Sequence, residues 1–140
     1  MIYIKLNTDW NTEPNAPEVQ LKVQGNKLEL EFFLNSFIFD HIHEDVKGQL
    51  IFENCFKYSF NSCNDEGYFR GQYRYKNEFL PWGEFYELKH DWKNDFHKEY
   101  IILDDKTDKN NLKHFILFSK NNTFECIAKD FQFRYLKNEI

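Results

Sequence analysis

The chain has 140 residues, a length typical of a single domain that buries its own hydrophobic core. Its formal net charge of −5 argues against a general nucleic-acid-binding protein, because such proteins usually carry an excess of basic residues. No apolar run is long enough to cross a membrane and no secretory signal peptide is recognisable, so we expect a cytoplasmic protein.

Aromatic residues are unusually frequent. They make up 19% of the chain, with 16 Phe, 8 Tyr and 3 Trp. Such residues favour pleated, half-buried surfaces, and they are also enriched at recognition surfaces. The favoured interpretation is an aromatic β core, because these rings bury a large area. The alternative is a dedicated aromatic binding face.

The N-terminal part of the chain predicts one strand and one loop. Residues 2–6 alternate between apolar and other residues, which indicates a strand with Ile2, Ile4 and Leu6 on one face. The stretch 7–17 is rich in Asn, Thr and Pro. We expect a loop there, because proline is disfavoured both inside a helix and in a central strand.

Residues 19–34 predict a β-hairpin down to its register. Gly25-Asn26 is a two-residue turn signal that suits a type II′ turn. Counting outward from the turn places apolar partners together on one face and charged or polar partners on the other, and a one-residue slip would mix them. The predicted pairs are Gln24 with Lys27, Val23 with Leu28, Lys22 with Glu29, Leu21 with Leu30, Gln20 with Glu31 and Val19 with Phe32.

After this hairpin the apolar run 37–39 predicts that its second strand continues past a bend or bulge at 35–36. His41 and His43 come next and would face the same side of a strand, as metal ligands do in some β-barrels. The surrounding run is polar enough for an exposed loop, and Lys47 and Gly48 occupy the region where such a metal motif would place its carboxylate ligand. The loop is therefore the favoured interpretation, and a metal site at the two histidines is the alternative.

Three further strands are predicted between residues 50 and 88. In the first, at 50–60, strict alternation places Leu50, Phe52, Phe56, Tyr58 and Phe60 on one face, and Glu53, Cys55, Lys57 and Ser59 on the other. A polar connector at 61–67 leads to a second alternating strand at 69–76. The third strand, at 82–88, places Trp82, Glu84, Tyr86 and Leu88 on one side.

The C-terminal third predicts short strands and a second hairpin. Residues 89–98 fit a short helix or an ordered loop, and 99–103 predict a short buried strand. The acidic run 104–108 lacks the spaced oxygen ligands and the glycine of an EF-hand loop. A hairpin is predicted at 114–128 with its turn at Asn121-Asn122, and a last strand at 131–135.

These elements predict one all-β domain that covers residues 1–140. With about nine strands and no long helix, we expect an antiparallel β-sandwich or a partly open barrel. A short helix packed on one sheet at 92–98 is an alternative for that segment.

No sequence motif for catalysis is present. The chain lacks a phosphate-binding glycine loop, a G-x-S-x-G elbow and an H-E-x-x-H pair. Cys55, Cys63 and Cys126 form no C-x-x-C pair and indicate free thiols. Cys63 lies in a predicted polar turn, but nothing in the sequence places a histidine beside it. We therefore assign no catalytic residue and no cofactor.

The densest polar chemistry lies around the predicted strands 69–76 and 82–88. The candidate binding residues are Asp65, Glu66, Arg70, Arg74, Trp82, Glu84 and Tyr86. They could form a carboxylate–guanidinium pocket with aromatic walls. The favoured alternative is that Arg70 and Arg74 pair with glutamates across a solvated sheet face, which would contribute little energy.

Three short segments carry a resemblance to known proteins: Asn64-Asp65-Glu66-Gly67, Trp82-Gly83-Glu84-Phe85-Tyr86-Glu87 and Thr123-Phe124-Glu125-Cys126-Ile127-Ala128. In this order they resemble a loose group of small uncharacterised bacterial proteins, some of which resemble immunity proteins of polymorphic toxin systems. The likeness covers roughly the C-terminal half and carries over no catalytic residue. It implies a bacterial, non-enzymatic binding protein.

We expect a cytoplasmic binding protein with a protein partner, such as a toxin that it neutralises. Acidic charge and surface aromatic residues suit that role. The alternative is a barrel that binds a small molecule or a sugar, or an enzyme built on such a barrel, with its pocket around Trp82, Glu84 and Tyr86. We do not expect nucleic acid or a membrane as a partner.

Overall fold

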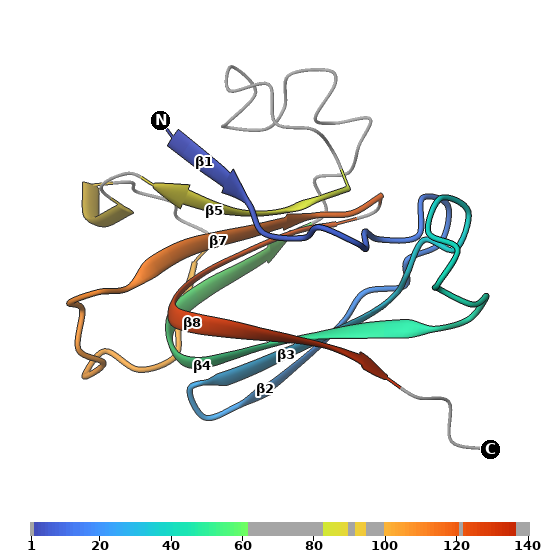
Figure 1. Cartoon of the computed structure of the whole chain (residues 1–140). Coiled ribbons are helices and arrows are strands. Elements are labelled where there is room, and N and C mark those ends of the chain that lie inside the picture. The colour runs from blue at the N-terminus through green and yellow to red at the C-terminus, as the bar shows by residue number, and fades with distance from the viewer. Residues whose placement is uncertain (1, 62–82, 90–91, 95–99, 121, 137–140) are drawn as a thin grey trace.

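The computed structural model of the chain describes residues 2–61, 83–89, 92–94, 100–120 and 122–136. These residues form eight strands and a 3-10 helix (Figure 1). The strands are β1 (Ile2–Lys5), β2 (Gln20–Gln24), β3 (Lys27–Phe33), β4 (Lys47–Asn61), β5 (Phe85–Lys89), β6 (Ile101–Ile102), β7 (Lys113–Phe118) and β8 (Thr123–Leu136). The 3-10 helix, η2, covers Trp92–Asn94.

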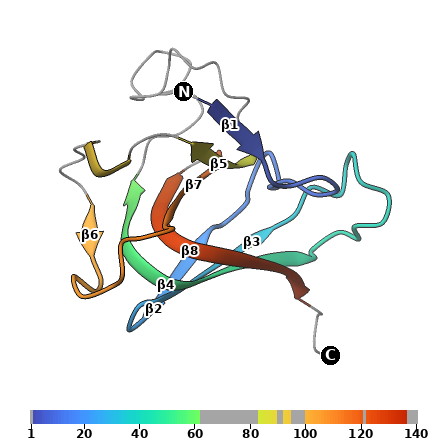
Figure 2. The ribbon, with the colours of Figure 1, turned by 60° about the vertical axis from the view of Figure 1, so that its left-hand side comes forward.

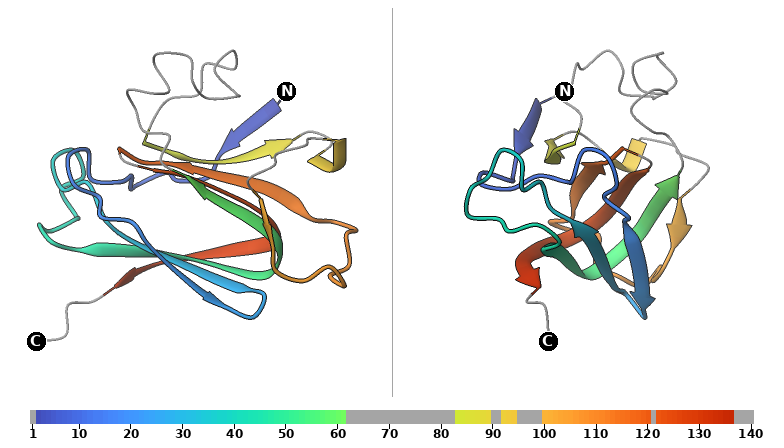
Figure 3. Two further views of the ribbon diagram at one scale, coloured as in Figure 1. Left: turned by 180° about the vertical axis from the view of Figure 1, so that it is seen from behind. Right: turned by 90° about the vertical axis from the view of Figure 1, so that its right-hand side faces the viewer.

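All eight strands belong to one antiparallel sheet with the order β1-β5-β7-β8-β4-β3-β2. The eighth strand, β6, pairs with the second half of β4, whereas β3 pairs with the first half. Figure 2 shows β6 standing beside β4. β1 and β2 lie at the two ends of the sheet and do not pair with each other, as the side view in Figure 3 shows. The predicted all-β fold is confirmed, in the form of an open, strongly curled sheet.

The two longest strands, β4 and β8, bend together and join the two layers of the sheet (Figure 1). In β4 the core-facing residue after Phe52 is Cys55, and in β8 the core-facing residue before Phe131 is Ala128. Both intervals break the strict alternation of a strand. Asn54, with a φ of +53°, lies within the bend and is exposed. The reversal of phase in both strands lets one sheet fold over its own core.

Aromatic rings from the two layers meet in this core. The ring of Phe52 on β4 lies 6.1 Å from that of Phe85 on β5 and 5.5 Å from that of Phe115 on β7. β5 and β7 are not neighbours of β4 in the sheet, so these contacts form across the fold. The predicted aromatic β core is therefore present. Burial of these large rings in it stabilises the fold.

The segment between β1 and β2 spans the open side of the sheet. At one end the amide of Leu6 donates to the carbonyl oxygen of Phe85 (2.9 Å). Further along, the amide of Asn35 donates to the carbonyl oxygen of Asn11 (3.0 Å), and that of Glu13 to the carbonyl oxygen of Phe33 (2.9 Å). This segment therefore links the edge near β5 to the end of β3 without forming a continuous strand.

The first hairpin has the predicted register. The structure pairs Gln24 with Lys27, Val23 with Leu28, Lys22 with Glu29, Leu21 with Leu30 and Gln20 with Glu31. The sixth predicted pair, Val19 with Phe32, is not part of the ladder, because β2 begins at Gln20. Gly25 has a φ of +62°, as the first central position of a type II′ turn requires. The pairing of the second predicted hairpin is also present, between β7 and β8, with Phe118 opposite Thr123. Asn121 of its predicted turn lies outside the described residues, and the separately predicted strand at 131–135 is the continuation of β8.

Two predicted strand segments are wrong. The run 37–39 does not extend β3, because Asn35 Oδ1 accepts a hydrogen bond from the amide of Phe37 (2.9 Å) and closes a turn. Phe37 and Ile38 are exposed as a result. The predicted buried strand at 99–103 is instead the two-residue edge strand β6, whose isoleucines are exposed.

The predicted faces of β4 are wrong in its middle. Cys55 points into the main core rather than away from it, because the phase changes at Asn54. A bulge between Cys55 and Lys57 then turns Phe56 to the other face, where its ring lies 5.9 Å from that of Trp92. The alternation of apolar and polar residues in the sequence cannot predict these shifts, because the extra residue at each shift has no distinctive residue type.

Candidate functional site

Of the predicted pocket residues, Asp65, Glu66, Arg70, Arg74 and Trp82 lie outside the described part of the chain. Glu84 and Tyr86 are described, and neither lines the three cavities discussed below.

Glu84 joins β5 to the N-terminal segment. Its Oε1 accepts from Asn11 Nδ2 (3.0 Å), and its Oε2 accepts from Asn7 Nδ2 and lies 3.6 Å from Lys5 Nζ. Tyr86 is buried, and its ring makes an edge-to-face contact with Tyr3. In the described part of the chain, Glu84 therefore contributes hydrogen bonds and an ion pair that stabilise the fold, and Tyr86 contributes to packing.

His41 and His43 lie in the exposed loop before β4, as the favoured interpretation predicted, and not on a strand. His41 Nε2 lies 3.3 Å from the hydroxyl of Tyr135 and 3.9 Å from Asp9 Oδ2. Partial burial raises the pKa of Tyr135, and the charge and hydrogen bond of Asp9 add to this shift. The described residues contain no group of three or more side chains suited to hold a metal ion.

A buried polar cluster, which the sequence reasoning missed, connects β7, β8 and the residue before β6. His114 Nε2 lies 2.8 Å from Glu125 Oε1, and the hydroxyl of Tyr100 lies 3.2 Å and 3.1 Å from the same two atoms. The side chains of His114 and Glu125 are essentially inaccessible to solvent. The sequence contained a signal for this cluster. His114 and Glu125 are polar residues on the same face of the predicted hairpin, and their neighbours on both strands are mostly apolar.

A cavity of about 610 Å³ lies between the loop before β2 and the loop between β3 and β4. We call it the acidic groove, because four carboxylate residues and no basic residue line it. Its lining residues are Glu13, Asn15, Ala16, Glu18, Phe33, Leu34, Ser36, Phe37, Glu44 and Asp45. The sequence could not predict this groove, because its two loops are separated by the whole first hairpin.

The lining carboxylates differ in how they are held. Glu13 accepts hydrogen bonds from the amides of Asn15 and Ala16 and so orders its own loop. Glu18 and Asp45 have left-handed backbones, with φ of +49° and +68°. Glu18 and Glu44 are exposed, so their charges face solvent at the mouth of the groove.

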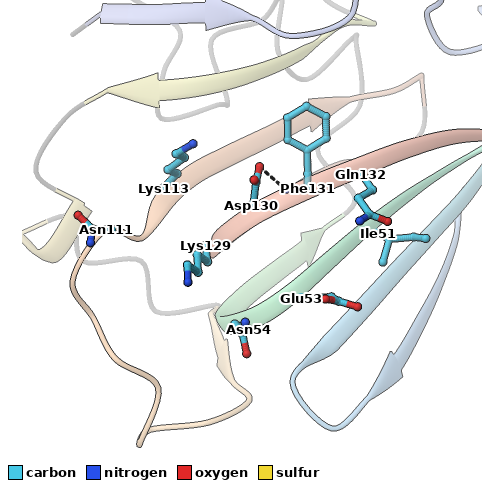
Figure 4. A pocket seen from close by; sticks show the side chains of 9 residues that line it. All are labelled: Ile51, Glu53, Asn54, Asn111, Lys113, Lys129, Asp130, Phe131 and Gln132. Carbon is cyan, nitrogen blue, oxygen red and sulfur yellow. Dashed lines mark hydrogen bonds between the residues drawn. The ribbon is translucent and has the colours of Figure 1, made fainter.

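A second cavity, of about 470 Å³, lies at the bend of β4 and β8; we call it the polar pocket. Figure 4 shows its nine lining side chains, which come from β4, β8, the start of β7 and the loop before it. They are Ile51, Glu53, Asn54, Asn111, Lys113, Lys129, Asp130, Phe131 and Gln132. A third cavity, of about 320 Å³, shares Asn54, Asn111 and Lys129 with it.

Comparison with protein-family models, curated proteins and solved structures finds no match to this chain. Among the described residues, no helix is long and apolar enough to span a membrane.

Proposed function

We propose that this chain is a non-enzymatic, cytoplasmic binding protein that recognises a basic protein partner at the acidic groove. The observation that carries this proposal is one surface that combines four carboxylates with the exposed aromatic ring of Phe37. The resemblance of the sequence to immunity-type proteins supports a toxin as the partner, neutralised by this contact.

The charge of the groove supports a basic partner. The lining carries four formal negative charges, and Lys47, which is not a lining residue, has its Nζ 4.8 Å from the centre of the ring of the lining residue Phe33. That cation offsets only part of the negative charge, and the whole chain is acidic as well. Complementary charge accelerates association with a basic surface and disfavours acidic partners.

Apolar side chains beside the groove support a protein rather than a small ion as the ligand. Phe37 is 72% exposed and its neighbour Ile38 is 63% exposed. Adjacent large apolar side chains on the surface often mark an interaction site, and aromatic anchors supply much of the binding energy at protein interfaces.

The backbone of the groove also supports a functional role. Glu18 is not a residue type that commonly adopts a left-handed backbone, which costs roughly 1–2 kcal/mol for residues with a Cβ. Strain of this kind tends to occur at binding sites, where the position of a side chain matters more than the stability it costs.

The test is capture of partners from a lysate of the native host with three tagged forms of the protein. They are the wild type, a groove variant with Glu18→Gln and Glu44→Gln, and a control variant with Glu53→Gln and Asp105→Asn. Both variants remove two exposed carboxylates, so their net charges are equal. We expect a basic protein that the wild type and the control retain, and that the groove variant binds roughly tenfold more weakly.

The same pair of variants separates a specific site from general charge attraction. Equal weakening in both variants would mean that only net charge matters, and equal capture by all three forms would refute the groove. Adding Phe37→Ala to the wild type gives an independent test, because it alters the apolar contact without changing charge.

A further inference from the structure

We infer that the polar pocket is a second, separate binding site and that its ligand class is a neutral saccharide. The pocket shares no lining residue with the acidic groove. Its volume of about 470 Å³ lies within the range of about 300–1,000 Å³ that is typical of small-molecule sites. The inference therefore does not depend on the proposed protein partner.

The first argument is that the polar groups around the pocket are available to a ligand. Within the part of the chain that the structure describes, six lining side chains make no hydrogen bond or ion pair of their own. They are Glu53, Asn54, Asn111, Lys113, Lys129 and Gln132. Asp130 uses one oxygen to accept from the amide of Phe131 (2.8 Å), which leaves the other oxygen available.

The second argument is that the fold itself creates this cluster. The change of phase in β4 and β8 exposes two consecutive residues on each strand, Glu53 with Asn54 and Lys129 with Asp130. A regular strand would expose only every second residue on this face. Asn54 and Asn111 both have left-handed backbones, with φ of +53° and +64°. The bend therefore concentrates polar side chains from three chain segments around one cavity, as Figure 4 shows.

The third argument concerns charge. Two ammonium groups, Lys113 and Lys129, and two carboxylates, Glu53 and Asp130, line the pocket, so its formal charge is zero. A phosphate would be repelled by the carboxylates, and a cation by the lysines. Glu53 on β4 lies opposite Asp130 on β8, and Lys129 is the residue before Asp130, so positive and negative groups lie together in the lining and neither sign is offered alone. The arrangement favours an uncharged ligand.

The fourth argument concerns hydrogen bonding and shape. Carboxylates only accept, ammonium groups only donate, and the amides of Asn54, Asn111 and Gln132 do both. Such a mixture matches hydroxyl groups, each of which donates and accepts. Phe131 adds a half-buried ring, whose edge-to-face contacts with Phe85 (5.1 Å) and Phe115 (5.5 Å) hold it in place. A fixed aromatic ring beside mixed donors and acceptors suits the apolar face and the hydroxyls of a sugar ring.

The adjoining third cavity extends the same chemistry. Besides the three shared residues, it is lined by Asn26, Asp104, Thr107, Asp108, Asn110 and Leu112. These are mainly amide, carboxylate and hydroxyl side chains. The continuous surface would accept an oligosaccharide, with one ring in the polar pocket and another beside the loop before β7.

The test uses a printed array of neutral and acidic oligosaccharides, followed by calorimetric titration of the best neutral binder. The key variant is Asn54→Gly with Asn111→Gly, because glycine keeps the left-handed backbone while it removes both amides. We expect wild-type protein to bind a neutral saccharide and this variant to bind it at least about tenfold more weakly. The groove variant with Glu18→Gln and Glu44→Gln should bind like the wild type.

A second variant, Glu53→Gln with Gln132→Ala, changes only exposed side chains and covers the case in which the glycine variant folds poorly. It should weaken binding as well. The inference is overturned if the array shows no neutral binder, if only acidic saccharides bind, or if a folded pocket variant keeps wild-type affinity. None of these results would bear on the protein partner, because its binding site is tested by substitution of Glu18 and Glu44, which do not line the polar pocket.

Discussion

The indole of Trp10 lies parallel to the ring of Phe133, with the ring centroids 4.2 Å apart and the planes inclined by 7°. Trp10 also contacts the rings of Phe32 on β3 and Phe85 on β5. One side chain from the N-terminal segment therefore touches both layers of the folded sheet. It fills the side that the strands leave open.

We expect Trp10→Ala to lower the free energy of unfolding by about 3–5 kcal/mol, because it removes a buried indole and leaves a cavity. Urea unfolding followed by circular dichroism measures the change. The control is Phe37→Ala, an aromatic side chain that is mostly exposed and should change stability by less than about 1 kcal/mol. A loss below about 1 kcal/mol for Trp10→Ala would contradict the role of Trp10 in closing the core.

The hairpin turn gives a prediction about backbone conformation. Gly25→Ala should cost about 1 kcal/mol, because φ at this position is +62° and a Cβ is disfavoured there even though the space is open. Asn26→Ala is the control, since Asn26 does not have a positive φ. Equal stabilities of the two variants would show that the turn adapts to the substitution.

Glu18 should show a conflict between stability and binding. Glu18→Gly relieves the left-handed backbone strain and should raise stability by up to about 1 kcal/mol relative to Glu18→Gln. Both substitutions should weaken capture of the protein partner, because both remove the carboxylate. If the Glu18→Gly variant binds the partner as tightly as the wild type does, the charge of Glu18 is not what the partner recognises.

The core thiols predict a loss of stability at alkaline pH. Burial raises the pKa of Cys126 well above its usual range, and the hydrogen bond and charge of Cys55 add to the shift. Above the ordinary thiol pKa the unfolded chain releases the proton while the folded chain keeps it. The free energy of unfolding should therefore fall as pH rises, by up to about 1.4 kcal/mol per pH unit from this group.

Comparison with Cys126→Ala isolates this effect. The variant should be less stable than the wild type near neutral pH, because it leaves a small cavity, and the difference should narrow between about pH 8 and about pH 10. Urea unfolding at a series of pH values measures it. A constant difference over this range would mean that another group causes any alkaline loss of stability.

The buried pair His114 and Glu125 should be strongly coupled. Removing one partner, as in Glu125→Ala, should cost about 3–5 kcal/mol, because it leaves a buried polar group without this bond. The double variant His114→Ala with Glu125→Ala should lose less than the sum of the two single variants. Thermal and urea unfolding of the wild type, the two single variants and the double variant gives a double-mutant cycle. Additive losses of stability would exclude coupling between the two side chains.

Local patterns were sufficient for the two hairpins. The register from Gln20 to Glu31 follows from a two-residue turn and from apolar alternation, both of which act between residues close in the chain. The predictions failed where a single residue changes the backbone: Asn35 closes a turn after β3, and Asn54 reverses the inward face of β4. Asparagine is compatible with strand, turn and left-handed conformations, so only the surrounding contacts decide among them.

The candidate sites depend on more than local pattern. The sequence by itself determined an acidic, aromatic, all-β chain with two hairpins and no catalytic motif. Only the tertiary structure brought Glu18 and Asp45 to one groove, and Asn54, Asn111 and Lys129 to one pocket. Such contacts join residues far apart in the chain, and they arise from the folding of one sheet over its own core. The alternation of residues along a strand determines which face of the sheet a side chain occupies. The bends in β4 and β8 determine which parts of the sheet lie against each other.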